Sequence, residues 1–264
     1  TLLPTAALAA ENGITVYSGE HTHSDWLASD YGTDAKTLVL RAGGPTNTYG
    51  NPLEKQRDGD WILPAGNYYL KNDITVEYAI VISSNVTVTI CLNGKTITGQ
   101  TATGNNTTDP VFRVENGGKL TLKDCMDTAG KVTHTGYKAS YGVPAGVQVL
   151  EGGIFNLYSG KISGNREAGV YLNDNNAGTF NLYGGEISGN ERGVYVGRGG
   201  TFNMSGGTIK DHKNSKGVDC VGNFKMSDGT ISGCGDGVYL HCYEKTNGGY
   251  GYGTFTMTGG TITE

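Results

Sequence analysis

The sequence has little of the proline, charge and long apolar stretches that mark several large classes of protein. Only 6 of its 264 residues are proline, and 17% are charged against 9% aromatic. Disordered chains carry more charge and fewer aromatic residues, and collagen needs a strict Gly-X-Y register that is absent here. A net charge of −5 leaves no basic patch for nucleic acid. No stretch approaches about 18 apolar residues, so we expect no transmembrane span.

Glycine is the abundant residue instead. Glycine makes up 44 of the 264 residues, about one in six, whereas its typical share in proteins is about 7%. Each glycine inside a helix costs roughly 1 kcal/mol relative to alanine, which argues against a helical bundle. Tight turns between short strands, in contrast, make use of the conformational freedom of glycine. The composition therefore predicts an all-β protein.

A repeat fills the second half of the chain. Its landmarks are phenylalanines separated by 25, 22, 22 and 31 residues, namely Phe155, Phe180, Phe202, Phe224 and Phe255. An apolar residue stands two positions after each phenylalanine, and an isoleucine follows five positions later, as in Leu157/Ile162, Leu182/Ile187, Met204/Ile209, Met226/Ile231 and Met257/Ile262. Self-similarity at such a period is typical of solenoid proteins.

Each unit contains three short runs of alternating apolar and polar residues, such as 180–182, 186–188 and 194–196. Three strands per unit of about 22 residues predict one triangular coil of a right-handed parallel β-helix, with about seven or eight coils in all. Stacking places equivalent residues about 4.8 Å apart, so the phenylalanines and the isoleucines should form interior columns. A third interior column is expected from Phe112, Val147, Val170, Val194, Val218 and Val238.

The residues between the runs predict sharp corners. Glycine pairs such as Gly184-Gly185 stand where the chain must turn, and a corner of this kind needs a positive φ. Asn165 and Asn190 are expected to adopt the same left-handed conformation, which asparagine tolerates.

Several segments resemble the right-handed parallel β-helix proteins of the pectin-lyase-like superfamily. They are GNYYLKNDITV (66–76), ICLNGKTITG (90–99), LTLKDC (120–125) and the FNLYSGKISGN units. More narrowly, they look like β-helix segments of secreted surface proteins from Gram-positive bacteria. The resemblance covers residues 66–264 and implies the fold. It leaves the activity open, because this fold hosts lyases, hydrolases, adhesins and structural spacers.

The first 65 residues lack the repeat. Residues 1–10, TLLPTAALAA, read as a signal-peptide remnant and predict a secreted, cell-surface protein, with an ordinary apolar strand or cap as the alternative. Residues 11–65 are expected to form an N-terminal cap with one strand near 37–41, because an open β-helix end exposes strand edges. Residues 66–264 form the predicted β-helix. Since residue 264 falls within a coil, we expect the natural protein to continue.

Two outward columns supply the candidate binding residues. One contains Arg113, Gln148, Tyr171, Tyr195, Asp219 and Tyr239, and the other contains Tyr158, Tyr183, Ser205, Ser227 and Thr258. Outward tyrosines form amphipathic platforms for sugar rings, so ligand binding is predicted for Arg113, Tyr158, Tyr171, Tyr183, Tyr195 and Tyr239. The alternative is that stacked tyrosines only stabilise neighbouring coils. Insertions near 101–109, 126–129, 134–143 and 241–253 are further candidate positions for function.

Catalysis has fewer candidate residues. Polysaccharide hydrolases need carboxylates clustered on one face, and lyases need acids that hold calcium beside a basic residue. Asp211, His212 and Asp219 are the nearest such group, with a solvated corner as the alternative. No cofactor is expected unless the protein is a lyase that uses Ca²⁺.

Histidines and cysteines give weaker signals. His21 and His23 are candidate metal ligands if a third ligand such as His134 or His241 joins them, and a solvated pair is the alternative. The cysteines are Cys91, Cys125, Cys220, Cys234 and Cys242. By alternation Cys220 points into the core. Cys91 points outward one coil before Cys125, so a disulfide between Cys91 and Cys125 is an open alternative. None has a base at catalytic spacing.

Together these features predict a secreted or cell-surface module that binds an extracellular glycan or host cell-surface polysaccharide, or that acts as an adhesion scaffold. The alternatives are a polysaccharide lyase or glycoside hydrolase, and a passive structural spacer.

Overall fold

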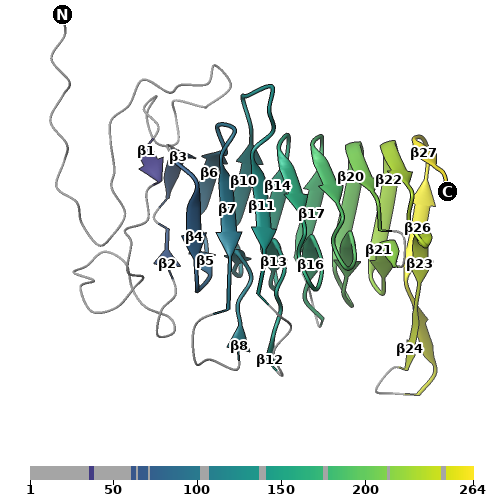
Figure 1. The fold of residues 1–264 in the computed structure, drawn as a ribbon. Coiled ribbons are helices and arrows are strands. Elements are labelled where there is room, and N and C mark those ends of the chain that lie inside the picture. The colour runs from purple at the N-terminus through teal and green to yellow at the C-terminus, as the bar shows by residue number, and fades with distance from the viewer. Residues whose placement is uncertain are drawn as a thin grey trace, which may run out of the picture.

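The structure is a computed structural model that describes residues 36–38, 61–63, 65–70, 72–101, 107–136, 141–174, 178–212, 215–244 and 248–264. Every regular element within these ranges is a β-strand, as the glycine content predicts. Almost all of the strands pair in parallel and stack into one parallel β-helix, which confirms the predicted fold (Figure 1). The expected signal-peptide remnant, His21 and His23 lie outside the described residues.

The strands form three rows along the molecule, and a typical coil contributes one strand to each row. The first row contains β1 (Lys36–Leu38), β3 (Gly66–Leu70), β6 (Thr87–Cys91), β10 (Lys119–Lys123), β14 (Ile154–Leu157), β17 (Thr179–Leu182), β20 (Thr201–Lys210), β22 (Asn223–Ser232) and β26 (Thr254–Met257). The second row contains β4 (Ile74–Val76), β7 (Thr96–Gly99), β11 (Lys131–His134), β15 (Lys161–Ser163), β18 (Glu186–Ser188) and β27 (Thr261–Ile262). Because β20 and β22 continue around the corner into the second row, the two rows form one sheet.

The third row is a separate sheet of eight strands, which agrees with the predicted number of coils. It contains β2 (Trp61–Ile62), β5 (Ile80–Ile82), β9 (Phe112–Val114), β13 (Val147–Val149), β16 (Val170–Leu172), β19 (Val194–Val196), β21 (Lys216–Cys220) and β23 (Asp236–Leu240). Sheet pairing in this row begins at Trp61, which is paired with Ile80, ahead of residue 66 where the sequence repeat begins. The strand expected near 37–41 is β1, which pairs with β3.

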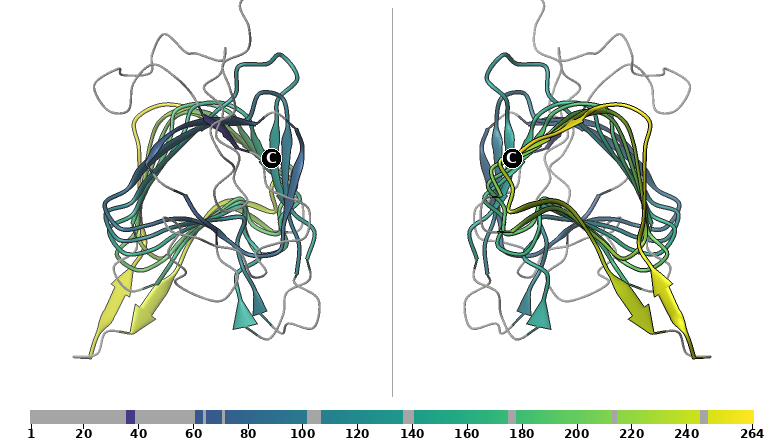
Figure 2. Two further views of the ribbon diagram at one scale, coloured as in Figure 1. Left: turned by 90° about the vertical axis from the view of Figure 1, so that its left-hand side faces the viewer. Right: turned by 90° about the vertical axis from the view of Figure 1, so that its right-hand side faces the viewer.

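The helix is right-handed, as the resemblance implies. In the left panel of Figure 2 the N-terminal end faces the viewer. As the chain recedes it runs clockwise from the first row through the second to the third. Right-handed crossovers are the rule between parallel strands because they follow the natural twist of the strands.

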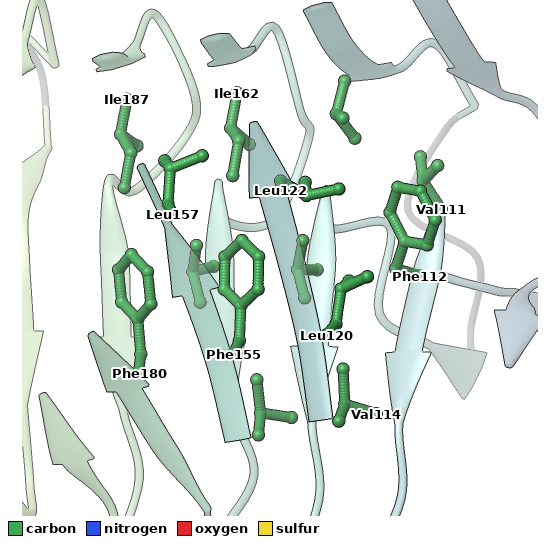
Figure 3. Close-up of a cluster of buried hydrophobic side chains, with 14 of the residues drawn as sticks. Val111, Phe112, Val114, Leu120, Leu122, Phe155, Leu157, Ile162, Phe180 and Ile187 are labelled. Atoms are coloured by element: carbon green, nitrogen blue, oxygen red, sulfur yellow. The ribbon is translucent and has the colours of Figure 1, made fainter. Parts of the chain in front are cut away.

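The interior columns are those that the repeat predicts. Successive phenylalanine rings from Phe155 to Phe255 lie 4.6–5.0 Å apart, and their planes differ by at most 15°. Ile162, Ile187 and their equivalents lie in register beside them, and all but the last members are fully buried (Figure 3). Cys220 pairs with Val196 and Leu240 in the third row and belongs to this core, as expected.

The corners after the second row differ from the expectation for asparagine. Gly164 and Gly189 carry the positive φ there, with values of 74° and 59°, whereas Asn165 and Asn190 do not. The asparagine side chains instead turn inward: Asn190 Oδ1 accepts from the backbone N–H of Asn165 at 3.0 Å, and its Nδ2 donates to the carbonyl of Ile162 at 3.1 Å. Glycine supplies the backbone bend, and asparagine satisfies the buried backbone groups that the bend leaves.

Insertions before two third-row strands and after a third one form two projecting arms. β8 (Thr107–Thr108) pairs with β12 (Tyr141–Gly142) before the third row begins in two successive coils. β24 (Cys242–Glu244) pairs antiparallel with β25 (Tyr250–Tyr252) directly after β23. Figure 2 shows that the two arms point to the same side of the molecule. These arms are two departures from the regular stacking of the coils.

Candidate functional site

The outward column of the third row exists as predicted. Strand pairing places Arg113, Gln148, Tyr171, Tyr195, Asp219 and Tyr239 opposite one another on successive strands. Their environments differ widely, because the turns and arms around each coil differ. The column is therefore a row of distinct local sites rather than one uniform surface.

The tyrosines of the regular coils form tight stacks. Tyr158 lies on Tyr183 with ring centroids 4.6 Å apart, and Tyr171 lies on Tyr195 at 4.7 Å. Because each ring covers one face of its neighbour, each tyrosine of these pairs offers at most one ring face, with its edge and hydroxyl group, to a ligand. The geometry is the one expected of stacks that support neighbouring coils.

Cations cover further faces of the same stacks. Lys123 Nζ lies 5.5 Å from the ring centre of Tyr158, and the guanidinium carbon of Arg192 lies 4.9 Å from that of Tyr195. Both distances are typical of cation–π contacts. Burial, with a contribution from Asp174, raises the pKa of Tyr195, so its hydroxyl stays protonated and donates to that carboxylate at 3.1 Å.

Arg113 is buried in its coil. Its guanidinium donates to Asp109 Oδ1 at 2.7 Å, and the two side chains are only 6% and 14% exposed. Asp109 belongs to the insertion that carries β8, so the arm supplies the carboxylate that pairs with the arginine. A ligand would have to displace this ion pair to reach Arg113.

Asp219 is the centre of an ion network on the outer side of the third row. Its carboxylate, 3% exposed, accepts from Arg192 Nη1 at 3.1 Å and lies 2.5 Å from His241 Nε2. Lys216 Nζ is 3.9 Å away, and Arg192 also pairs with the buried Glu167 through Nη2. A carboxylate this deeply buried requires such partners, since an unpaired buried charge is costly.

Tyr239 lies at the solvent-facing edge of this network. Its ring is 42% exposed and contacts the Lys216 ammonium at 4.8 Å and the edge of the His241 ring at 4.7 Å. An ammonium group and an imidazole thus lie against one exposed aromatic ring. His241 then leads directly into β24, so the network continues into the projecting arm.

The structure does not join Asp219 to Asp211 and His212. His212 is buried, its Nδ1 lies 2.9 Å from the carbonyl oxygen of Asn190, and burial lowers its pKa. Asp211 takes a φ of 61° and occupies the corner position that glycine holds in neighbouring coils, such as Gly189. These two residues therefore form part of a corner, and no hydrogen bond or ion pair links them to Asp219 in the described chain.

The remaining histidine expected as a metal ligand is also engaged. His134 is buried, its Nδ1 accepts from the backbone N–H of Gly136 at 3.1 Å, and burial lowers its pKa to about 4. The described residues contain no cluster of three or more His, Cys, Asp or Glu side chains arranged to hold a metal ion.

The arm formed by β24 and β25 carries two tyrosines that the sequence reasoning did not select. Tyr250 and Tyr252 are 58% and 65% exposed and make no ring contact with another described residue. Tyr250 lies opposite Glu244 and Tyr252 opposite Cys242, so these four side chains share one face of the hairpin.

The other face of this hairpin is turned toward the coils. Gly251 lies opposite Tyr243, and a Cβ on Gly251 would approach the Tyr243 ring to 2.3 Å. The guanidinium carbon of Arg198, from the corner after β19, lies 4.4 Å from the centre of the same ring. This contact fixes the orientation of the hairpin and turns Tyr250 and Tyr252 outward. The alternation of tyrosine and glycine in GGYGYG (248–253) is the signal that could have identified this face.

No helix in the described part of the chain is long and apolar enough to span a membrane. Comparisons of the chain with models of protein families, with curated proteins and with solved structures found no match.

Proposed function

We propose that the protein is a secreted or cell-surface β-helix module that binds an extracellular glycan through the outward face of the β24–β25 hairpin. The observation that carries this proposal is the exposure of Tyr250 and Tyr252, 58% and 65%, whereas each stacked tyrosine has one ring face covered by its partner. Open aromatic rings with a polar edge suit the mixed apolar and hydroxylated faces of sugars. Exposed apolar groups gathered at one place are typical of binding sites.

Glu244 and the Asp219 network would supply the polar contacts. Glu244 shares the hairpin face with Tyr250, and its exposed carboxylate accepts hydrogen bonds from sugar hydroxyls. Beyond the hairpin, Lys216 and Tyr239 offer donors at the end of the third row. A glycan chain lying along the hairpin and the end of the third row would contact the tyrosine rings of the hairpin and then the Asp219 network.

Secretion, surface attachment, bacterial origin and membership of the pectin-lyase-like superfamily belong to the same proposal. The apolar stretch TLLPTAALAA and the repeated FNLYSGKISGN units support them. A rigid solenoid that presents a binding hairpin on a projecting arm also fits an adhesion scaffold, because loops on a rigid frame are the usual location of recognition residues.

An array of bacterial, plant and animal polysaccharides tests glycan binding. The wild-type protein should bind at least one glycan class, and the double variant Tyr250→Ala/Tyr252→Ala should lose that binding. The matched control Tyr158→Ala/Tyr183→Ala removes two tyrosines from a covered stack and should keep it. If the wild-type protein binds nothing on the array, glycan binding by the hairpin is refuted. Loss of binding in the control alone would move the site to the stacked column.

A polysaccharide lyase is the second candidate, and the Asp219–His241 contact at 2.5 Å favours it. A carboxylate that holds an imidazole at the surface is the arrangement of an oriented general base. Incubation with uronate-containing polysaccharides, with and without Ca²⁺, should then release unsaturated products that His241→Gln abolishes. An absence of unsaturated product under both conditions would exclude the lyase.

A further inference from the structure

Two cysteines from successive coils lie in contact at the corner between the first and second rows. Cys91 ends β6 and is fully buried, with Tyr69 packed against it. Its thiol points at Cys125 Sγ, 3.3 Å away. Cys125 is exposed and follows β10, the strand that pairs directly with β6. One sulfur atom is therefore accessible from solvent and the other lies beneath it.

The loop that carries Cys125 is held firmly by Asp124. The Oδ1 atom of Asp124 accepts from the backbone N–H groups of Gly94 at 3.1 Å and Met126 at 3.0 Å, and Oδ2 accepts from Gly130 N–H. The Ser159 hydroxyl donates to the Asp124 carbonyl at 2.8 Å. The aspartate thus ties its loop to the coils on both sides, and Cys125 is held over Cys91 by the fold rather than by chance.

The two sulfur atoms lie only a little farther apart than the atoms of a disulfide bond. A disulfide has an S–S length of about 2.05 Å, so the two atoms must approach by about 1.2 Å. Rotation of an exposed side chain about χ1 moves its sulfur by this much without a change in the backbone. The two parallel strands already hold the residues on adjacent coils.

We propose that Cys91 and Cys125 form a reversible disulfide that clips the coil of β6 to the coil of β10 and that is made by exchange with a low-molecular-weight disulfide. In the first step Cys125, as its thiolate, attacks one sulfur of the small disulfide, forms a mixed disulfide and releases one small thiol. In the second step Cys91 loses its proton to solvent and its sulfur attacks Cys125 Sγ, which expels the second small thiol. Two protein thiols are oxidised and one small disulfide is reduced to two thiols.

The second step should be slow at neutral pH. Burial, with the neighbouring Cys125, raises the pKa of the Cys91 thiol to about 12. Only the thiolate attacks, so ring closure should accelerate by about tenfold per pH unit below that value. Among the titratable and charged groups near the pair, Tyr69 of β3 packs against Cys91, Lys123 of β10 is in register with Cys91, and Asp124 directly precedes Cys125. At neutral pH the mixed disulfide on Cys125 should therefore accumulate first.

The experiment uses oxidised glutathione as the small disulfide and the full chain with Cys242→Ser, which removes the other exposed thiol. At about pH 7 intact mass should show one glutathione adduct, and at about pH 9 it should show loss of two hydrogen atoms instead. Peptide mapping should then join Cys91 to Cys125. The clipped protein should melt several degrees higher than the reduced protein, and dithiothreitol should reverse the change.

Two further variants make the outcome decisive. Cys125→Ser should abolish both the adduct and the clip, and Cys234→Ser, which removes a thiol elsewhere, should keep them. Circular dichroism of the reduced proteins confirms that each variant folds. A glutathione adduct that stays on Cys125 at about pH 9, or a bridge from Cys125 to any other cysteine, would overturn the proposal.

Discussion

Replacing Phe202 by alanine should unfold the β-helix at a much lower urea concentration, because this ring is enclosed on both sides. Phe202 is fully buried between Phe180 at 4.8 Å and Phe224 at 4.6 Å, with planes within 7° of each. Removing such a side chain from a core costs about 3–5 kcal/mol through lost burial and the cavity that remains. Two ring stacks of about 0.5–1.5 kcal/mol each place the expected value in the upper part of that range.

Phe255 provides the matched comparison because it belongs to the same column but stacks on a single ring, that of Phe224, among the described residues. It lies 4.8 Å from Phe224 and is partly buried, so Phe255→Ala should cost about half as much as Phe202→Ala. Urea unfolding followed by circular dichroism measures both, and Phe202→Leu should recover most of the loss. A cost below about 1 kcal/mol for Phe202→Ala, or equal costs at the two positions, would refute the enclosed column.

Two further predictions concern the corner and the surface of the second row. Asp211 adopts a φ of 61° that glycine adopts more easily, so Asp211→Gly should raise the free energy of unfolding by about 0.5–1 kcal/mol. The reverse change Gly189→Asp, into open space at a φ of 59°, should lower it by a similar amount, and thermal unfolding measures both. Burial alone would raise the pKa of Glu186, but bonds from Lys161, Ser188 and Lys210 outweigh it and lower the pKa to about 2. The carboxylate therefore stabilises the fold above its ordinary pKa of 4.5, and this contribution is lost as the pH falls through about 2. Glu186→Gln should cost about 0.5–1 kcal/mol at neutral pH and nothing near pH 2, and equal costs at both pH values would contradict the linkage.

The architecture could be predicted because the spacing of a few apolar residues reveals the repeat. Once Phe155, Phe180 and Phe202 are aligned, alternation within each strand fixes which neighbours point inward and which point outward. The third-row column from Arg113 to Tyr239 followed from the same alignment and was found in register. Identical side chains on adjacent coils therefore carry most of the information about this fold.

The environment of each outward residue could not be predicted in this way, because it depends on turns and insertions that differ between coils. Asp219 finds Arg192 and His241, which come from a turn in the coil before and from the end of the next strand, respectively. Arg113 is covered by Asp109 from an insertion, although alternation places it outside the helix. The spacing of the repeat does not show which outward residue a side chain from a turn or an insertion will contact.

The exposed position of Tyr250 could not be predicted from the sequence either. The insertion that contains it is visible in the sequence, but its pairing with Glu244 across an antiparallel hairpin depends on where the turn falls. The Arg198 contact with Tyr243, which decides the outward face, joins residues from different coils. The most exposed aromatic side chains of the described residues therefore lie in a short insertion, outside the repeat from which the fold is predicted.

The most direct test of glycan binding by the β24–β25 hairpin is a calorimetric titration with the glycan that the wild-type protein binds best. Tyr250→Ala/Tyr252→Ala should weaken binding at least about tenfold, as expected when exposed aromatic contacts of a binding site are truncated. Tyr158→Ala/Tyr183→Ala should change the dissociation constant less than about twofold, because the two rings of that stack cover each other and lie outside the hairpin. Unchanged affinity in the hairpin variant, with loss of binding in the stack variant, would contradict the proposed site.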